Sequence, residues 1–166
     1  MSEALEPPPP GSGAWLADRW RDAWVIGTPE AFGECCSVEV FYEDALAIEP
    51  REGLGELAEH AVGLRTAFPD MRIEAAGEAV IDGRNGCIPW RVIGTHRGDA
   101  GDVPHTGRFL TLAGVHYVSL VDGRIRRARG FFDLYDAAVQ LGMLPRRGSI
   151  GESAIMLLRG FGLRRA

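Results

Sequence analysis

The spacing of apolar residues divides the chain into a helical first half and a strand-rich second half. Apolar residues recur every three to four positions over residues 14–26 and 50–68, which predicts two long helices. Pro29 can open a shorter helix that runs through Cys35. Val38 to Tyr42 alternates like a strand, and four longer segments rich in β-branched and aromatic residues predict further strands: 71–81, 87–97, 109–121 and 124–133.

Turn residues connect these strands in an antiparallel order. Asp122-Gly123 is a strong signal for a two-residue hairpin, residues 82–86 form a second turn, and a longer loop covers residues 98–108. Residues 134–141 predict a short helix, and the apolar residues 155–158 can form a terminal one. Helices followed by an antiparallel meander predict an α+β roll, in which a curved sheet buries one face under the helices and encloses a cavity.

The predicted organisation is a single domain with a segment on either side. The run from Pro7 to Pro10, followed by Gly-Ser-Gly, predicts a disordered leader over residues 1–13. The folded domain covers residues 14–145, and residues 146–166 form a tail rich in Arg and Gly. The 166 residues suffice for one domain with a core.

Composition and charge limit the classes of binding partner that we expect. The net charge of −5 argues against a nucleic-acid surface, which needs a basic stripe. The three cysteines make no disulfide framework and fit a reducing compartment, and neither a signal peptide nor a membrane span is visible. We therefore expect a cytoplasmic protein with no membrane partner. The four histidines match no metal motif and no phosphate-binding Gly loop occurs, so we expect neither a metal nor a cofactor.

The Asp122-Gly123 turn predicts which side chains share a face of the sheet. If Val121 faces Arg124, then His116 faces Arg129 and Leu112 faces Asp133. One face would then combine apolar groups with an Asp, a His and an Arg, as ligand pockets do. The opposite face is also apolar, and a homodimer is a natural way to cover it.

Several stretches in a fixed order resemble the SnoaL-like branch of the nuclear-transport-factor-2-like superfamily. They are Ala67-Phe68-Pro69-Asp70, then residues 90–98, then Pro104-His105-Thr106-Gly107-Arg108, then Asp122-Gly123-Arg124-Ile125 and Asp133. The resemblance covers roughly residues 14–145. It implies a cone-shaped α+β barrel with a curved antiparallel sheet packed on the N-terminal helices.

The resemblance implies a cofactor-free enzyme acting on a hydrophobic oxygenated small molecule such as a polyketide or terpenoid. Ring closure or isomerisation is the leading hypothesis. Residues 129–133 also resemble a stretch of the limonene-epoxide-hydrolase-like members, which makes epoxide opening an alternative, although a second carboxylate has no clear counterpart. A non-catalytic module that binds a small molecule is the third hypothesis.

Three residues are the candidate catalytic groups. Asp133, to which the resemblance points, would be the general acid or base, since apolar cover raises a carboxyl pKa toward the useful range. Its alternative role is to cap the helix that begins at Leu134. His116 is a proton relay or a core histidine, and Arg129 binds a substrate oxygen or forms a structural charge pair.

The remaining candidates would line the pocket. Each of these positions is also compatible with an ordinary core or surface role. They are Trp24, Phe41, His60, Trp90, Leu112 and Phe131.

Overall fold

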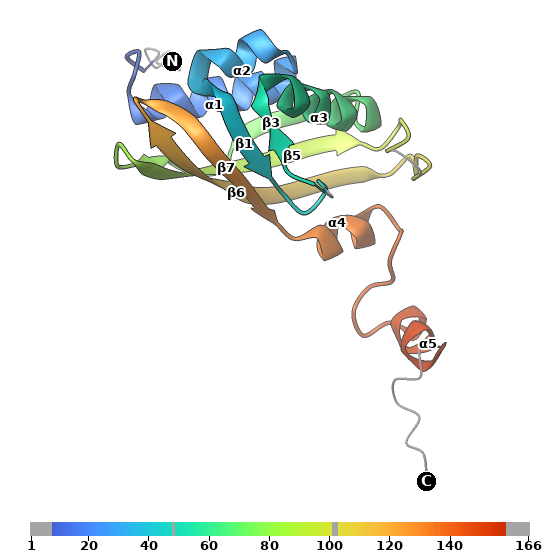
Figure 1. Ribbon diagram of the computed structural model, residues 1–166. Helices are drawn as coiled ribbons and strands as arrows, with labels where there is room; N and C mark the ends of the chain where they lie inside the picture. Colours follow the sequence, from blue (N-terminus) through green and yellow to red (C-terminus); the bar gives the residue numbers. More distant parts are fainter. Residues whose placement is uncertain (1–7, 48, 101–102, 159–166) are drawn as a thin grey trace, which may run out of the picture.

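Three helices cover one face of a curved sheet in the computed structural model, which describes residues 8–47, 49–100 and 103–158 (Figure 1). The helices are α1 (Gly13–Ile26), α2 (Pro29–Cys35) and α3 (Gly53–Ala67). The predicted α+β arrangement is therefore present. Part of the predicted leader, residues 1–7, lies outside the described residues.

Local sequence signals set the ends of the first two helices. The Ser12 hydroxyl accepts a hydrogen bond from the Trp15 backbone N–H, which satisfies one of the free donors at the start of α1. Gly27 ends α1 in the left-handed conformation that glycine adopts without strain. Pro29 then opens α2, with Thr28 as its cap.

Seven strands form one sheet in the order β2-β1-β7-β6-β5-β3, with β4 paired to β5. β1 runs parallel to β7, and the other pairs are antiparallel. The strands are β1 (Cys36–Glu43), β2 (Arg51–Glu52), β3 (Arg72–Ala75), β4 (Val80–Ile81), β5 (Asn85–Thr95), β6 (Phe109–Val121) and β7 (Arg124–Phe132).

The strand predicted over residues 71–81 is wrong as a single element, because it is divided into β3 and β4. Pro89 explains the break. The Pro89 carbonyl faces Ala76, with 3.5 Å between Ala76 N and Pro89 O. Since the nitrogen and the carbonyl of one strand residue point to the same edge, the Pro89 nitrogen also faces β3 and β4, and it has no hydrogen to donate. The ladder therefore stops between the two short strands. The helix predicted over residues 50–68 similarly begins later, because Arg51 and Glu52 form β2.

The register predicted for the β6–β7 hairpin is also wrong beyond its first two pairs. Val121 pairs with Arg124 and Leu120 with Ile125, but a bulge then shifts the register, so His116 pairs with Gly130. The physical cause is the spacing of the inward residues on β7. Ile125 and Ala128 are both buried, and an interval of three cannot place both on one face of a regular strand.

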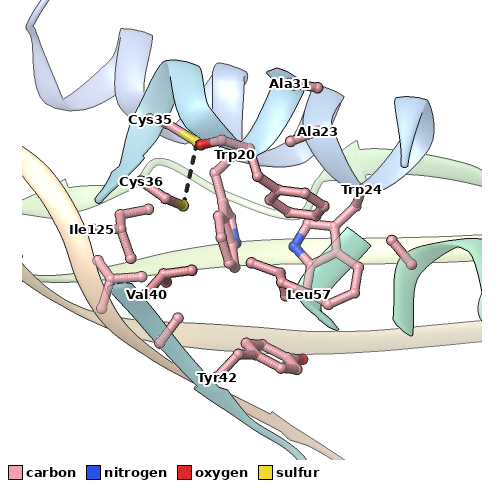
Figure 2. Packing of buried hydrophobic residues seen from close by; sticks show 14 of the residues in the cluster. Trp20, Ala23, Trp24, Ala31, Cys35, Cys36, Val40, Tyr42, Leu57 and Ile125 are labelled. Carbon is pink, nitrogen blue, oxygen red and sulfur yellow. Dashed lines mark hydrogen bonds between the residues drawn. The ribbon is translucent and has the colours of Figure 1, made fainter. Parts of the chain in front are cut away.

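The core fills the space between the helices and the sheet, and Figure 2 shows the Trp20 ring at its centre. Trp20 packs edge-to-face against Trp24 and Phe32. A second, smaller buried cluster lies around Phe68, Leu110 and Leu141. Trp90 is buried but belongs to neither cluster.

Two helices follow the sheet. α4 (Leu134–Gln140) corresponds to the predicted short helix, and α5 (Ile150–Leu158) stands away from the sheet in Figure 1. In the described part of the chain, no helix has the length and apolar character needed to cross a membrane. The last part of the predicted tail, residues 159–166, lies outside the described residues.

Candidate functional site

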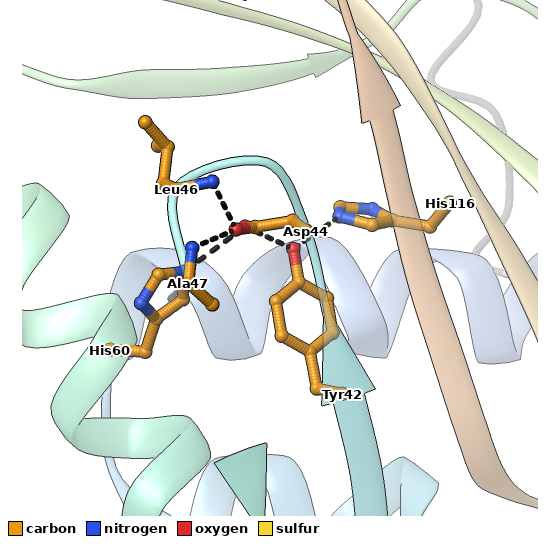
Figure 3. Close-up of polar contacts among 6 residues, drawn as sticks. All are labelled: Tyr42, Asp44, Leu46, Ala47, His60 and His116. Carbon is orange, nitrogen blue, oxygen red and sulfur yellow. Dashed lines mark hydrogen bonds and ion pairs between the residues drawn. The ribbon is translucent and has the colours of Figure 1, made fainter. Parts of the chain in front are cut away.

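A buried carboxylate, Asp44, lies just past the end of β1, on the face of the sheet that the helices cover. Alternation along β1 turns Val40, Tyr42 and then Asp44 inward. The Tyr42 hydroxyl donates to Asp44 Oδ2 over 2.7 Å, and the backbone N–H groups of Leu46 and Ala47 donate to Oδ1, each over 2.8 Å (Figure 3). These two backbone bonds form the tight turn that an aspartate favours after a strand.

His60, on α3, completes the contacts of this carboxylate. Its Nε2 lies 3.0 Å from Asp44 Oδ2, and the two side chains are only 9% and 3% exposed. Burial alone would raise the pKa of Asp44. The hydrogen bond and charge of His60, together with the hydrogen bonds from Tyr42 and Ala47, outweigh burial and lower that pKa to about 2. Asp44 is therefore ionised at neutral pH, and His60 Nε2 carries the hydrogen that it donates.

His116 forms the other end of the cluster. Its Nδ1 accepts the Trp20 indole N–H over 3.1 Å, and its Nε2 lies 3.3 Å from the Tyr42 hydroxyl oxygen. An indole nitrogen can only donate, so Nδ1 must be the unprotonated nitrogen and Nε2–H must donate to Tyr42. Burial lowers the pKa of His116 to about 3, which keeps the ring neutral.

Two glycines make room for these groups. A Cβ built on Gly130 would lie 2.9 Å from the Tyr42 hydroxyl oxygen and 3.0 Å from Asp44 Cβ. A Cβ on Gly114 would lie within 2.4 Å of the Trp90 ring. The absence of side chains at these positions lets both the polar cluster and Trp90 lie directly against the sheet.

Trp24 and Trp90 flank His116, and each has a buried indole N–H without a hydrogen-bond partner among the described residues. Trp24 is parallel to the His116 ring with 5.6 Å between centroids, and Trp90 lies 5.3 Å from it. The Trp24 and Trp20 rings meet edge-to-face, with 5.6 Å between their centroids. The Trp90 N–H remains a buried donor that a ligand oxygen could satisfy.

The structure brings together three of the predicted pocket residues: Trp24, His60 and Trp90 all surround the Asp44–His116 cluster. His116, predicted as a catalytic group, also lies there. Their rings contact one another in the region between helices and sheet where a cavity was predicted. No group of three or more His, Cys, Asp or Glu side chains that could hold a metal occurs among the described residues.

The other predicted residues lie elsewhere. The bulge in β7 turns Arg129 to the outer face of the sheet, where it lies over Phe131 and contacts Glu43. Phe41 also faces outward, under Arg127, and Leu112 packs against the second core cluster. Asp133 caps α4 by accepting the Asp136 N–H over 2.8 Å, beside an open hollow of about 470 Å³.

Sequence reasoning missed Tyr42, Asp44 and Trp20 as parts of a polar cluster. A signal was available for the first two, because the same alternation that makes Val40 a core residue also turns Tyr42 and Asp44 inward. An acidic residue on the buried face of a strand requires partners. The partner histidine on α3 could not be paired with it from spacing alone.

Comparisons with known proteins agree with this architecture. A family model described as SnoaL-like polyketide cyclase matches residues 14–141. Among proteins with curated functions, none matches the sequence significantly.

Solved structures with the same fold are numerous, at low sequence identity. A candidate SnoaL-like polyketide cyclase from Jannaschia sp. CCS1 is 19% identical, with a TM-score of 0.68, over 78% of this chain and 91% of that one. IdmH, a candidate polyketide cyclase from Streptomyces antibioticus, is 21% identical, with a TM-score of 0.64, over 76% and 96%. A protein with a ketosteroid-isomerase-like fold from Catenulispora acidiphila is 14% identical, with a TM-score of 0.64, over 76% and 92%. These likenesses confirm the predicted fold class.

Proposed function

This chain belongs to the SnoaL-like polyketide cyclase family, and on that basis we propose that it catalyses a cofactor-free proton transfer on a hydrophobic, oxygenated small molecule. A polyketide or terpenoid is the substrate class, and the result is ring closure or isomerisation. The observation that carries this proposal is the buried Asp44–His60 pair, with 3.0 Å between Oδ2 and Nε2.

His60, rather than Asp44, is the base in this proposal. Each oxygen of Asp44 already accepts two hydrogen bonds, and its pKa of about 2 makes it a poor proton acceptor. Because Nε2 of His60 donates to Asp44, its Nδ1 is the nitrogen left to accept a proton. That second nitrogen points away from Asp44 in Figure 3. Asp44 fixes the tautomer and stabilises the imidazolium, as carboxylates do in other His–Asp pairs.

The proposed reaction balances without a redox partner. His60 Nδ1 removes a proton from a carbon next to a carbonyl, which leaves an enolate. In ring closure the enolate carbon forms a bond to a second carbonyl carbon, and the resulting alkoxide takes the proton back from His60. In isomerisation, His60 returns the proton to a different carbon. Such proton transfer contributes roughly 10²- to 10⁴-fold in rate.

Trp90 is the proposed donor to the substrate oxygen. Its indole N–H is buried and lacks a partner among the described residues, and its ring packs 5.3 Å from His116. A donor fixed in a low-dielectric interior stabilises developing negative charge on an enolate oxygen. This assignment supports carbonyl chemistry over epoxide opening by water, because a carboxylate that activates water needs a free lone pair, and those of Asp44 are taken.

The test uses 2-tetralone, an apolar ketone with exchangeable protons beside its carbonyl. We expect the protein to accelerate exchange of these protons for deuterium, followed by NMR, and His60→Gln to reduce the rate by at least about 100-fold. Gln retains an N–H donor for Asp44 but accepts no proton at neutral pH. The control is His105→Gln, since His105 is exposed and pairs with Asp99 away from the cluster.

Three results separate the hypotheses. Loss of exchange in the His60 variant alone, with an unchanged circular dichroism spectrum, supports the proposal. Equal exchange in both variants places the base elsewhere. Binding of 2-tetralone with no exchange by the unaltered protein favours the non-catalytic binding module.

A further inference from the structure

The helix α5 exposes the largest concentration of aliphatic side chains in the described chain. Ile150 and Leu158 are 90% and 86% exposed, and Ile155, Met156 and Leu157 are exposed as well. Within the described ranges, α5 makes few contacts with the sheet or the other helices, and Figure 1 shows it apart from them. Apolar surface gathered in this way on a soluble domain marks an interaction site.

The start of α5 is specified by the chain itself. The Ser149 hydroxyl accepts the Glu152 N–H over 3.2 Å, and the Glu152 carboxylate accepts the Gly148 N–H. Nine residues are nevertheless too few for a helix to be stable alone in water. The helix therefore needs a surface on which to bury its apolar residues.

Four of the apolar residues of α5 form a stripe along the helix. Ile150, Ala154 and Leu157 follow at intervals of four and three, with Leu158 beside them, while Glu152 lies on the opposite side. A helix of this kind can lie flat on a surface with its stripe turned toward it.

The charge around α5 indicates what that surface is. Residues 146–166 contain five arginines and a single acidic residue, Glu152, in a chain whose net charge is −5. Arg146 and Arg147 precede the helix, and Arg159, Arg164 and Arg165 follow it. A helix with an aliphatic stripe and cations at both ends matches a lipid interface, where the stripe enters the acyl boundary and the cations remain at the phosphate level.

We propose that α5 and its flanking arginines attach this protein to an anionic lipid surface. The segment lies beyond residue 141, where the family match ends, so it is an addition to the domain. Nine residues are far short of a membrane span, and the contact is therefore peripheral. The proposal differs from our expectation of a protein with no membrane partner.

Co-sedimentation of the full chain with vesicles tests the proposal. We expect binding to vesicles that contain phosphatidylglycerol, reduced at high salt, and weak binding to phosphatidylcholine alone. Leu157→Ser with Leu158→Ser should lower binding at least tenfold, and so should Arg146→Gln with Arg147→Gln. Val80→Ser is the matched control, because Val80 is an aliphatic side chain 69% exposed on β4.

Three outcomes would overturn the proposal. The first is no binding to anionic vesicles, and the second is equal binding by the Leu157/Leu158 variant. The third is a dimer in solution that the same two substitutions dissociate, which would identify a second copy of this chain as the cover for α5. Since all the substituted residues are exposed, loss of folding does not confuse the result.

Discussion

Lowering the pH from about 7 to about 5 should destabilise this protein through His116, although no proton binds to His116 in the folded state over that range. The folded pKa of His116 is about 3, against an ordinary value of 6.5. Below pH 6.5 the unfolded chain binds a proton at this position that the folded chain does not. Stability is therefore fully present above 6.5 and is lost as the pH falls toward 3.

The size of the effect follows from these two pKa values. Each pH unit between them removes about 1.4 kcal/mol of unfolding free energy. Lowering the pH from 6.5 to about 5 should thus cost about 2 kcal/mol from His116 alone, a large part of the stability of a small domain. Most carboxylates titrate below this range, so they contribute little to the slope.

Urea denaturation followed by tryptophan fluorescence at several pH values measures this slope. His116→Asn is the matched variant, because an amide oxygen can still accept the Trp20 N–H but does not titrate. We expect the variant to be less stable at pH 7 and to lose about 2 kcal/mol less than the unaltered protein on acidification. An identical pH slope in both proteins would refute the neutral, buried state of His116.

Substitutions at Gly130, Asp133 and Asp44 test the remaining parts of the cluster and the cap of α4, with Gly63 as a control position. Gly130→Ala places a methyl group 2.9 Å from the Tyr42 hydroxyl and should cost about 1–3 kcal/mol in urea denaturation, whereas Gly63→Ala, which points into open space on α3, should stabilise by up to about 1 kcal/mol. Asp133→Ala removes the cap of α4 and should lower the unfolding free energy by about 1 kcal/mol, whereas Asp133→Asn keeps the cap. If Asp133→Asn has normal thermal stability but no turnover, Asp133 instead acts on the substrate. Ionised Asp44 stabilises the fold above its ordinary pKa of 3.8, and this contribution is lost as the pH falls through about 2. In an acid titration followed by circular dichroism, Asp44→Asn should therefore lack this loss of about 2 kcal/mol in unfolding free energy.

Most of the fold could be predicted from the sequence, because local signals specify it. Ser12 and Gly27 delimit α1, and Asp122-Gly123 adopts the left-handed backbone angles that a two-residue hairpin requires. The resemblance in ordered motifs supplied the fold class, but the parallel pairing of β1 with β7 was not predicted. No spacing along the chain predicts that pairing.

The site was predicted less well, and a single inserted residue accounts for much of the difference. The hairpin register was extended from the turn as if β7 were regular, which placed Arg129, Phe131 and Asp133 inside. The sequence did indicate this bulge. Arg126 and Arg127 are consecutive and lie between the buried Ile125 and Ala128, and both arginines can face solvent only at a bulge. A one-residue shift moves every later side chain to the other face.

The direction of the hydrogen bonds limits what this interior can do chemically. Trp20 donates to His116, His116 donates to Tyr42, and Tyr42 donates to Asp44, so every proton in the chain is shifted toward one carboxylate. If the bond between His116 and Tyr42 were reversed, the His116 hydrogen would move to Nδ1 and Trp20 would have to accept it, which an indole nitrogen cannot do. His116 and Tyr42 are consequently fixed as donors that hold the charge of Asp44 in place. Of the groups in this cluster, His60 alone keeps a ring nitrogen outside the chain, and the cluster is therefore suited to moving one proton at a time through that side chain.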